Sequence, residues 1–288
     1  MTDKRLIFLE RDGPGKHSGT IRSISTDGSN LTILCHVSGH PDGIMAKDGK
    51  IYWSNMGSVT DPSKAAYANP DGTMNVLEFE AGEWKDKIIC RDIVTPKQVW
   101  IDGDWIYFSD REGLAVKRVH LDGTGLETLY SSGDYNTQKL DCTLQCVGCC
   151  VHDGHVYFTQ KGPPKGGLGK ILRLNITTKQ VDILLDSLPE PIDVMFGPKS
   201  GLLYWTDRGG GPTGNSLNRA KIQGKTLEDH QVLALEFNEA IGLTISPCET
   251  FTFVSDLNGG IYSVNNNTRE KTKIYKGVSL TGIELIDA

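Results

Sequence analysis

Three residues of this sequence carry side chains suited to acid–base catalysis: His40, Asp42 and Glu239. A histidine whose pKa is tuned by a nearby carboxylate can take up and return a proton near neutral pH. His40 and Asp42 are close in sequence, whereas Glu239 can join them only if the fold brings it there. We expect these three to form the catalytic group, with His40 as the general base. The alternative is that His40-Pro41-Asp42-Gly43 is simply a turn.

A second set of side chains is suited to binding a substrate. Its members are cationic or polar groups that can hold an anion or a carbonyl oxygen. The set is Asn55, Lys97, Gln98, Arg111, Lys161, Asp193 and Arg208. Because four of these residues are cations in an otherwise acidic chain, we expect the ligand to be a small anionic or carbonyl-bearing molecule. The alternative is that these cations are solvated and paired with nearby acids.

Oxygen-bearing side chains that gather near one axis could instead hold a calcium ion, which takes about 6–8 oxygen ligands. The residues that could serve are Asn55, Glu190, Asp193 and Glu239. No local motif supports a metal site, so we expect no resident metal and no cofactor, with a calcium ion as the open alternative.

One group of cysteines has the spacing C-x3-C-x2-C-C and consists of Cys142, Cys146, Cys149 and Cys150. Four thiolates can bind zinc. However, Cys149 and Cys150 fall in a strand-like run, where a free cysteine packs as a small hydrophobic residue. We favour packing, and a nucleophilic Cys142 or Cys146 stays open.

The elements that would position these side chains follow an internal repeat. Residues 201–210 read GLLYWTDRGG, an apolar and aromatic run followed by small polar residues and glycines, which is typical of a strand ending in a turn. Five further copies read LIFLERDG, IYWSNMG, IYFSDREG, VYFTQKG and FVSDLNG. The copies recur about every 45 to 55 residues along the chain, a period that indicates a β-propeller.

The repeat resembles that of the YWTD family of six-bladed β-propellers, first known from the low-density lipoprotein receptor. One copy, Tyr204-Trp205-Thr206-Asp207, matches the family motif in full. The looser copies are Tyr52-Trp53-Ser54-Asn55, Tyr107-Phe108-Ser109-Asp110, Tyr157-Phe158-Thr159-Gln160 and Phe253-Val254-Ser255-Asp256. The resemblance implies an all-β fold with a single six-bladed propeller over residues 1–288. It says little about function, because one fold hosts many functions.

Each blade is expected to have four antiparallel strands, numbered from the inner strand at the channel to the outer strand at the rim. The first blade is shared between the chain ends, with residues 281–286 as its inner strand and 6–9, 20–24 and 31–36 as the others. The longest connections, 57–72, 133–145, 162–169 and 209–216, then emerge at one end of the ring. We call this end the top face and expect it to bind the ligand.

The repeat also places the candidate residues. The starts of the inner strands converge on the channel, and the candidates that adjoin them are His40, Asp42, Lys97, Gln98, Asp193 and Glu239. The residue at the Asp207 position is an acid or an amide in every copy, which we attribute to hydrogen bonds with turn amides or with the next blade. The next residue is cationic in four copies, at Arg11, Arg111, Lys161 and Arg208.

Composition restricts the classes of partner. The formal net charge of −6 argues against nucleic-acid binding, which requires a basic surface. No apolar stretch approaches the roughly 20 residues of a membrane span. Met1–Arg5 leaves no room for a signal peptide, and the odd number of cysteines suits a reducing compartment. We therefore expect a cytoplasmic monomer that contacts neither nucleic acid nor membrane.

Two functions follow as hypotheses. The first is a soluble, stand-alone enzyme of the hydrolase, lyase, isomerase or cyclase type. It would perform acid–base chemistry at the top-face channel mouth, with the loop 57–72 as a lid. The alternative is a non-catalytic protein- or ligand-binding module, as the resemblance to receptor domains implies. We favour the enzyme, because the chain has elaborated loops on one face and no adhesive modules.

Overall fold

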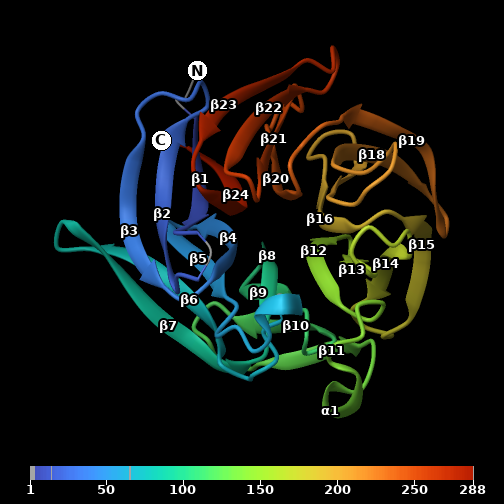
Figure 1. Cartoon of the computed structure of the whole chain (residues 1–288), viewed down its shortest axis with the longest axis horizontal. Coiled ribbons are helices and arrows are strands. Elements are labelled where there is room, and N and C mark those ends of the chain that lie inside the picture. The colour runs from blue at the N-terminus through green and yellow to red at the C-terminus, as the bar shows by residue number, and fades with distance from the viewer. Residues whose placement is uncertain (1–3, 14, 65, 288) are drawn as a thin grey trace.

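The computed structural model describes residues 4–13, 15–64 and 66–287, which form six four-stranded antiparallel sheets around a central channel (Figure 1). Blade one consists of β24 (Ser279–Asp287), β1 (Lys4–Arg11), β2 (Ser18–Ser25) and β3 (Thr32–Ser38). Blades two and three consist of β4 (Pro41–Lys47), β5 (Lys50–Asn55), β6 (Gly72–Glu80), β7 (Glu83–Ile93), β8 (Pro96–Asp102), β9 (Trp105–Asp110), β10 (Ala115–His120) and β11 (Glu127–Ser131). Blades four to six consist of β12 (Cys146–His152), β13 (His155–Gln160), β14 (Gly169–Asn175), β15 (Val181–Leu188), β16 (Pro191–Phe196), β17 (Leu203–Asp207), β18 (Ser216–Gln223), β19 (Thr226–Ala234), β20 (Ala240–Ile245), β21 (Phe251–Asp256), β22 (Gly260–Asn265) and β23 (Lys271–Lys276). The all-β, six-bladed prediction is confirmed.

Blade one joins the two ends of the chain. The last strand, β24, pairs antiparallel with β1, so that Leu6 lies opposite Leu285 and Phe8 opposite Ile283. The predicted inner strand at 281–286 is therefore correct. This pairing leaves the ring without an open gap between its first and last segments, where unpaired strand edges would otherwise be exposed.

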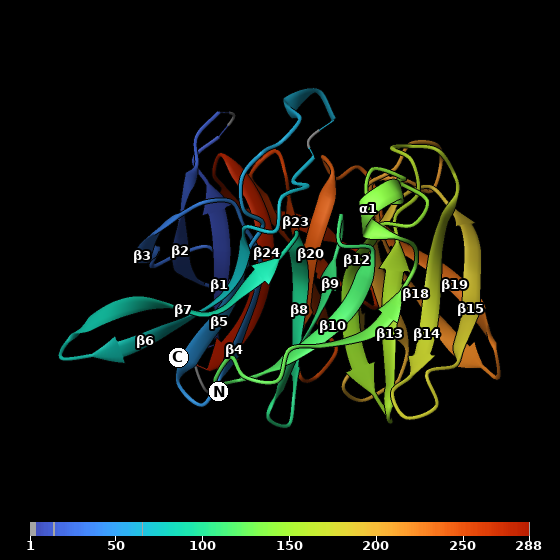
Figure 2. The same cartoon turned by 90° about the horizontal axis from the view of Figure 1, so that it is seen from below.

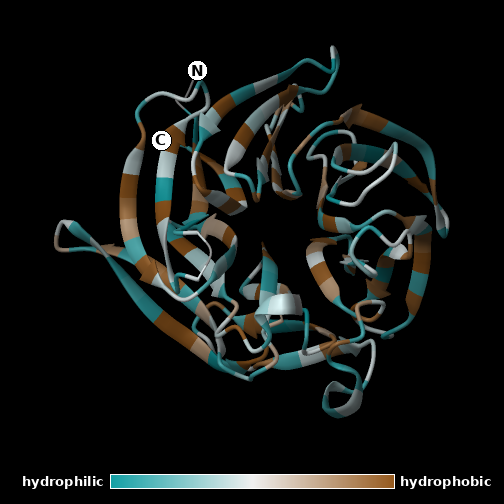
Figure 3. Cartoon of the chain, in the orientation of Figure 1, coloured by the Kyte–Doolittle hydropathy of each residue, from teal (hydrophilic) through white to brown (hydrophobic). Residues whose placement is uncertain are grey.

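The core lies between the blades, where the aromatic residues of the repeat are packed. Trp53, Phe108, Phe158 and Trp205 are fully or almost fully buried. The indole ring of Trp205 packs in a cluster with Cys150 and other apolar side chains of the preceding blade. Figure 3 shows hydrophobic residues along the strands of every blade, with hydrophilic residues common in the loops and turns.

The hydroxyl of the YWTD motif connects neighbouring blades. Thr206 Oγ1 accepts a hydrogen bond from the amide of Asp193 (3.0 Å) and donates one to the carbonyl of Ile241 in the next blade (2.6 Å). The hydroxyls that donate to the next inner strand in the same way belong to Ser54, Ser109, Thr159 and Ser255. These bonds satisfy buried polar groups and tie the inner strands into a ring.

The acidic position of the repeat is structural, as predicted. Asp207 accepts hydrogen bonds from the amides of Glu190 and Gly209, and thereby fixes the segment that leads into β16. The other residues at this position that accept amides in the same way are Glu10, Asn55, Asp110 and Asp256. Desolvation outweighs the two amide bonds and raises the pKa of Asp207 to about 6.

The long connections gather at one end of the ring (Figure 2). They include the 57–72 loop with its short helix η1 (Pro62–Lys64) and the 133–145 loop with α1 (Tyr135–Gln138). The β6–β7 hairpin is also long, but it projects outward from the rim instead of covering the channel. No helix in the described ranges is long and apolar enough to cross a membrane.

Candidate functional site

At one level of its six inner strands, the channel has a polar and an apolar half. In each inner strand, one residue pairs across the sheet with the acid or amide at the Asp207 position of the repeat. The next residue along each inner strand lies at one common level of the channel. These six residues are Asp42, Lys97, Val147, Ile192, Ile241 and Thr281, and all of them are buried. The three aliphatic side chains form one cluster across blades four to six. Polar chemistry at this level is therefore confined to blades one to three.

Asp42 and Lys97 form a buried ion pair between blades two and three. The ammonium of Lys97 contacts Asp42 Oδ1, and Gln98 Nε2 donates to Asp42 Oδ2 at 3.2 Å. Burial lowers the pKa of Lys97 to about 8, opposed by the charge of Asp42. The cations Arg111 and Arg208 lower this pKa further. The sequence prediction had placed Lys97 and Gln98 at the site but had not paired them with Asp42.

Arg111 lies over the same mouth and is paired with its neighbour in sequence, Glu112. The guanidinium Nε donates to both carboxylate oxygens of Glu112 at 2.9 and 2.8 Å. Burial opposes ionisation of Glu112, but Arg111 outweighs it and holds the pKa of that carboxyl below its usual range. The ring of Tyr67 lies 5.5 Å from the Arg111 guanidinium carbon, and its hydroxyl accepts a hydrogen bond from Arg11.

Glu190 connects the two remaining cations of the mouth. Arg208 Nε and Nη2 both donate to Glu190 Oε1, at 2.9 and 2.7 Å. Lys161 Nζ lies 3.8 Å from the same oxygen and donates to the carbonyl of Gly162 at 3.2 Å. Burial lowers the pKa of Lys161, and the nearby charge of Arg208 lowers it further.

These charged groups form one cluster, which we call the mouth cluster. Its members are the cations Arg11, Lys97, Arg111, Lys161 and Arg208 and the carboxylates Asp42, Glu112 and Glu190. Five positive charges and three negative ones leave these eight groups with a net charge of +2, although the chain as a whole carries −6. The hypothesis of solvated cations paired with nearby acids is correct in its pairing for four of them, but Lys97, Arg111 and Lys161 are buried instead of solvated. The pairing does not neutralise the cluster.

The loop 57–72 covers the mouth cluster at blades two and three. Tyr67, which it contributes, is buried between Arg111 and His40. The loop is held by hydrogen bonds from Thr95 Oγ1 to the carbonyl of Tyr67 (2.6 Å) and from the Tyr135 hydroxyl to the carbonyl of Ala68 (2.8 Å). This position agrees with the one expected of a lid.

The expected pairing of His40 with an acid is not formed. His40 Nδ1 lies 3.0 Å from the carbonyl of Gly57, and the ring packs against His17 and Tyr67. Asp42 is instead held by Lys97 and Gln98, because its side chain points along the channel toward blade three. Burial lowers the pKa of His40, and the charges of Arg11 and His17 lower it further.

Glu239 is also separated from His40. Its side chain is exposed, and its backbone amide donates to Asn215 Oδ1 at 2.7 Å.

Asn55, expected to bind substrate, accepts hydrogen bonds from the amides of His40 and Gly57 and therefore has a structural role. The four residues considered for calcium are thus dispersed. Within the described ranges, no group of three or more His, Cys, Asp or Glu side chains could hold a metal ion.

Asp193 lies deeper in the channel than the mouth cluster. With Gln98 and Glu284 it lines a cavity of about 10 Å³, which we call the lower cavity. Burial raises the pKa of Asp193 to about 7 and that of Glu284 to about 8, and the charge of Asp193 adds to the second shift. A cavity of this size holds about one water molecule, so the lower cavity is too small for a substrate.

The cysteine cluster is not a metal site. Cys146, Cys149 and Cys150 are buried in the cores between blades, and burial raises the pKa of all three thiols, that of Cys146 to about 12. Packing is therefore the correct interpretation for these three. Cys142 lies partly exposed on the 133–145 loop, and a nucleophilic role for it stays a prediction.

Three residues of the site were missed by the sequence prediction: Tyr67, Glu112 and Glu284. Glu112 directly follows a predicted substrate-binding arginine, and that adjacency was a usable signal for an ion pair. Tyr67 lies within a loop, and Glu284 lies five residues past Ser279, the start of the inner strand. Neither position has a periodic pattern that could have revealed it.

Comparisons with known proteins place this architecture in a family. The chain is 35% identical to low-density lipoprotein receptor-related protein 1 of Pyricularia oryzae, over 98% of both chains. The chain belongs to the YWTD family of β-propellers. No family model matches it. This YWTD propeller is also 32% identical, over 95% of its length, to the 3-hydroxyacyl-CoA dehydrogenase-like protein LAM1 of Cochliobolus heterostrophus, and it spans 62% of that relative's length.

Solved structures support the same fold. The YWTD propeller matches a chain of the nidogen–laminin complex with a TM-score of 0.75 and 15% sequence identity, over 98% of both chains. It matches a putative 6-phosphogluconolactonase of Bacteroides uniformis with a TM-score of 0.58 and 11% identity, over 96% of this chain and 84% of that one. At these identities the likeness concerns the fold alone.

Proposed function

We propose that this YWTD propeller binds a small anionic molecule that carries a carboxylate or a carbonyl group, at the mouth cluster beneath the 57–72 loop. The observation that carries this proposal is the net charge of +2 of the eight mouth-cluster side chains, six of which are buried while Arg11 and Arg208 are partly exposed. Uncompensated charge in a partly buried cluster is costly, and an anionic ligand would reduce that cost. Lys161 and Arg208 are the cations best suited to receive it, because they share one carboxylate oxygen.

Catalysis at this site is a second candidate, and the Asp42–Lys97 pair favours it. A lysine whose pKa is about 8 has a neutral amine in a useful fraction of molecules near neutral pH. The neutral amine could remove a proton from the carbon next to a carbonyl and return it, with Asp42 stabilising the ammonium formed in between. In this assignment Lys97 replaces His40 as the general base.

Binding is tested by thermal shift and calorimetric titration with citrate, succinate and 2-oxoglutarate. We expect at least one of these anions to raise the melting temperature of the protein. Lys161→Gln should abolish that shift and still fold, because Glu190 keeps its two bonds to Arg208. Lys225→Gln, which removes the same charge from a side chain that is 66% exposed, should respond like the unchanged protein. A melting temperature that none of the three anions changes would overturn the proposal.

Catalysis is tested separately, by hydrogen–deuterium exchange at the carbon next to the carbonyl of 2-oxoglutarate in D₂O. If Lys97 is the base, the exchange rate should rise as the pH passes about 8, because only the neutral amine can accept a proton. Lys97→Gln should return exchange to the rate without protein. If 2-oxoglutarate binds but its exchange is not catalysed, the catalytic proposal is wrong and the protein is a non-catalytic binding module.

A further inference from the structure

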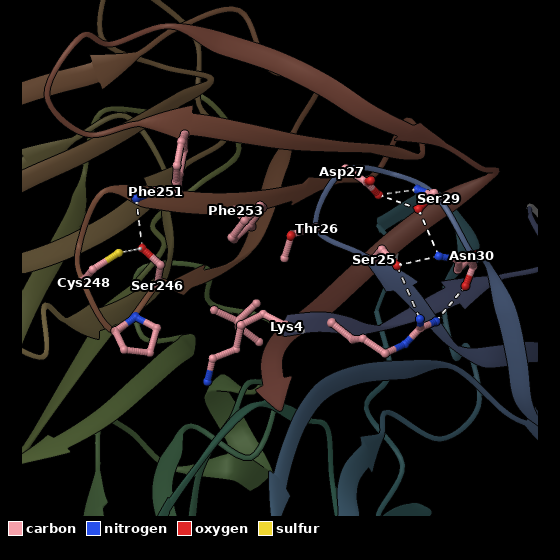
Figure 4. A pocket seen from close by; sticks show the side chains of 13 residues that line it. Lys4, Ser25, Thr26, Asp27, Ser29, Asn30, Ser246, Cys248, Phe251 and Phe253 are labelled. Atoms are coloured by element: carbon pink, nitrogen blue, oxygen red, sulfur yellow. Dashed lines mark hydrogen bonds between the residues drawn. The ribbon is translucent and has the colours of Figure 1, made fainter. Parts of the chain in front are cut away.

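A second cavity lies at the face opposite the mouth cluster, where blade six meets blade one. It has a volume of about 650 Å³ and lies between the β2–β3 turn and the β20–β21 turn. Figure 4 shows Ser246, Cys248, Phe251 and Phe253 on one side of it and Ser25, Asp27, Ser29 and Asn30 on the other. Small-molecule sites in proteins have volumes of roughly 300–1,000 Å³, so this cavity is large enough for one.

The blade-six wall of this cavity is apolar. Phe253 is buried, whereas Phe251 is 38% exposed although it lies on a strand. Pro247 and Leu285 extend the apolar surface around the two rings. An exposed aromatic ring beside a buried one offers a flat ligand two faces for stacking or edge contacts.

The blade-one wall is polar and supplies two cations with different partners. Lys4 is paired with the carboxylate of Asp287 at 2.5 Å. Arg5 instead donates to Ser23 Oγ (2.7 Å), to Ser25 Oγ (3.4 Å) and to the carbonyl of Asn30 (2.7 Å), all of which are neutral. These bonds fix the guanidinium without neutralising its charge, so it can still receive an anion.

We propose that this cavity is a binding site for an aromatic carboxylate, with its ring against Phe251 and Phe253 and its carboxylate toward Arg5. The site is independent of the mouth cluster, since the two lie at opposite ends of the ring. It needs no covalent step. The ligand class follows from the lining, in which one wall is apolar and aromatic and the other presents Arg5, with the carboxylate of Asp27 on the same wall held by the amide and hydroxyl of Ser29.

Cys248 provides a direct readout of occupancy. Its thiol is exposed at the cavity wall, with Sγ 3.5 Å from Ser246 Oγ. Hydrogen bonds with Ser246 and Thr250 lower the pKa of this thiol to about 7, so much of it is a reactive thiolate at neutral pH. A ligand in the cavity would cover the thiol and slow its modification.

The experiment measures the rate at which Ellman's reagent modifies Cys248, in a Cys35→Ser, Cys142→Ser background that removes the partly exposed thiols. The probes are 2-naphthoate and its neutral analogue 2-naphthamide. We expect 2-naphthoate to slow modification in a saturable manner and 2-naphthamide to do so about tenfold more weakly, because it cannot form a charged pair with Arg5. No protection by 2-naphthoate, or equal protection by both probes, would overturn the proposal.

Two matched variants separate the site from general surface binding. Phe251→Thr removes an exposed ring from a strand of the cavity wall and should weaken protection by about tenfold. Phe79→Thr removes a ring that is 59% exposed on the distant β6–β7 hairpin and should leave protection unchanged. Equal effects of the two substitutions would contradict a defined site, and calorimetric melting of both variants shows that they fold.

Discussion

Glu112 and Glu284 are the same kind of side chain in one channel, yet their pKa values shift in opposite directions. Glu112, in the mouth cluster, is buried against Arg111, which outweighs burial and lowers its pKa. Glu284, at the lower cavity, is half-buried near Asp193, and desolvation and that charge raise its pKa to about 8. The comparison shows that burial alone does not decide protonation in this ring. At Glu112 the Arg111 cation outweighs desolvation, whereas at Glu284 desolvation is the largest cause of the shift.

The largest effect is expected from Glu112→Gln, which leaves the buried Arg111 without its carboxylate. Removing one partner of a buried ion pair costs about 3–5 kcal/mol, and we expect a loss of that size in the free energy of unfolding at pH 7. Urea denaturation measures it. The double variant Arg111→Met, Glu112→Gln should recover most of the loss, because it removes both charges.

The exposed pair of Glu80 and Lys87 on the β6–β7 hairpin is the matched control for this substitution. Glu80 is 46% exposed, and Glu80→Gln should cost less than about 1 kcal/mol, as is usual for surface ion pairs. If Glu112→Gln cost no more than Glu80→Gln, the mouth pair would not be stabilising and the contrast with Glu284 would fail.

An intermediate, pH-dependent effect is expected from Glu284→Gln. A carboxyl whose pKa is raised on folding contributes stability at low pH, and that stability is lost as the pH rises through the folded value of about 8. The variant lacks this titration, so relative to the unchanged protein it should gain on the order of 2 kcal/mol between pH 5 and pH 8. Urea denaturation at the two pH values measures the difference. Parallel pH profiles for the two proteins would show that Glu284 is not forced to stay protonated.

The fold could be predicted from the sequence because the blade motif occurs six times along the chain. Each copy of the motif places an aromatic ring between blades, a hydroxyl against the next inner strand and an acid or amide against a turn, as Trp205, Thr206 and Asp207 do. A repeated signal of this kind survives imperfect copies such as Phe253-Val254-Ser255-Asp256. Even the pairing of the two chain ends followed from the period.

The site could be predicted only as a location. Lys97, Arg111, Lys161 and Arg208 do gather at the mouth, since the repeat fixes where each inner strand begins. Their partners could not be predicted, because each is set by side-chain direction at a single position of a single blade. His40 was paired with Asp42 on sequence proximity, yet His40 lies just before β4 and Asp42 within it, and the two side chains have different partners.

The smallest effect is expected from His40→Asn, and its sign opposes that of Glu284→Gln. Burial, aided by the charges of Arg11 and His17, lowers the pKa of His40 below 6.5, so the folded state keeps this ring neutral while the unfolded state takes up a proton. Stability from His40 should therefore rise with pH up to about 6.5 and stay constant above it.

Asparagine keeps an N–H near the position of Nδ1 but does not titrate, so the unchanged protein should lose stability relative to the variant as the pH falls below 6.5. Thermal melting at pH 5 and pH 7.5 measures this, with the exposed His36→Asn as the matched control. A relative gain at low pH would mean that His40 is charged in the folded protein, and an acid partner of the kind first expected from the sequence would then have to exist.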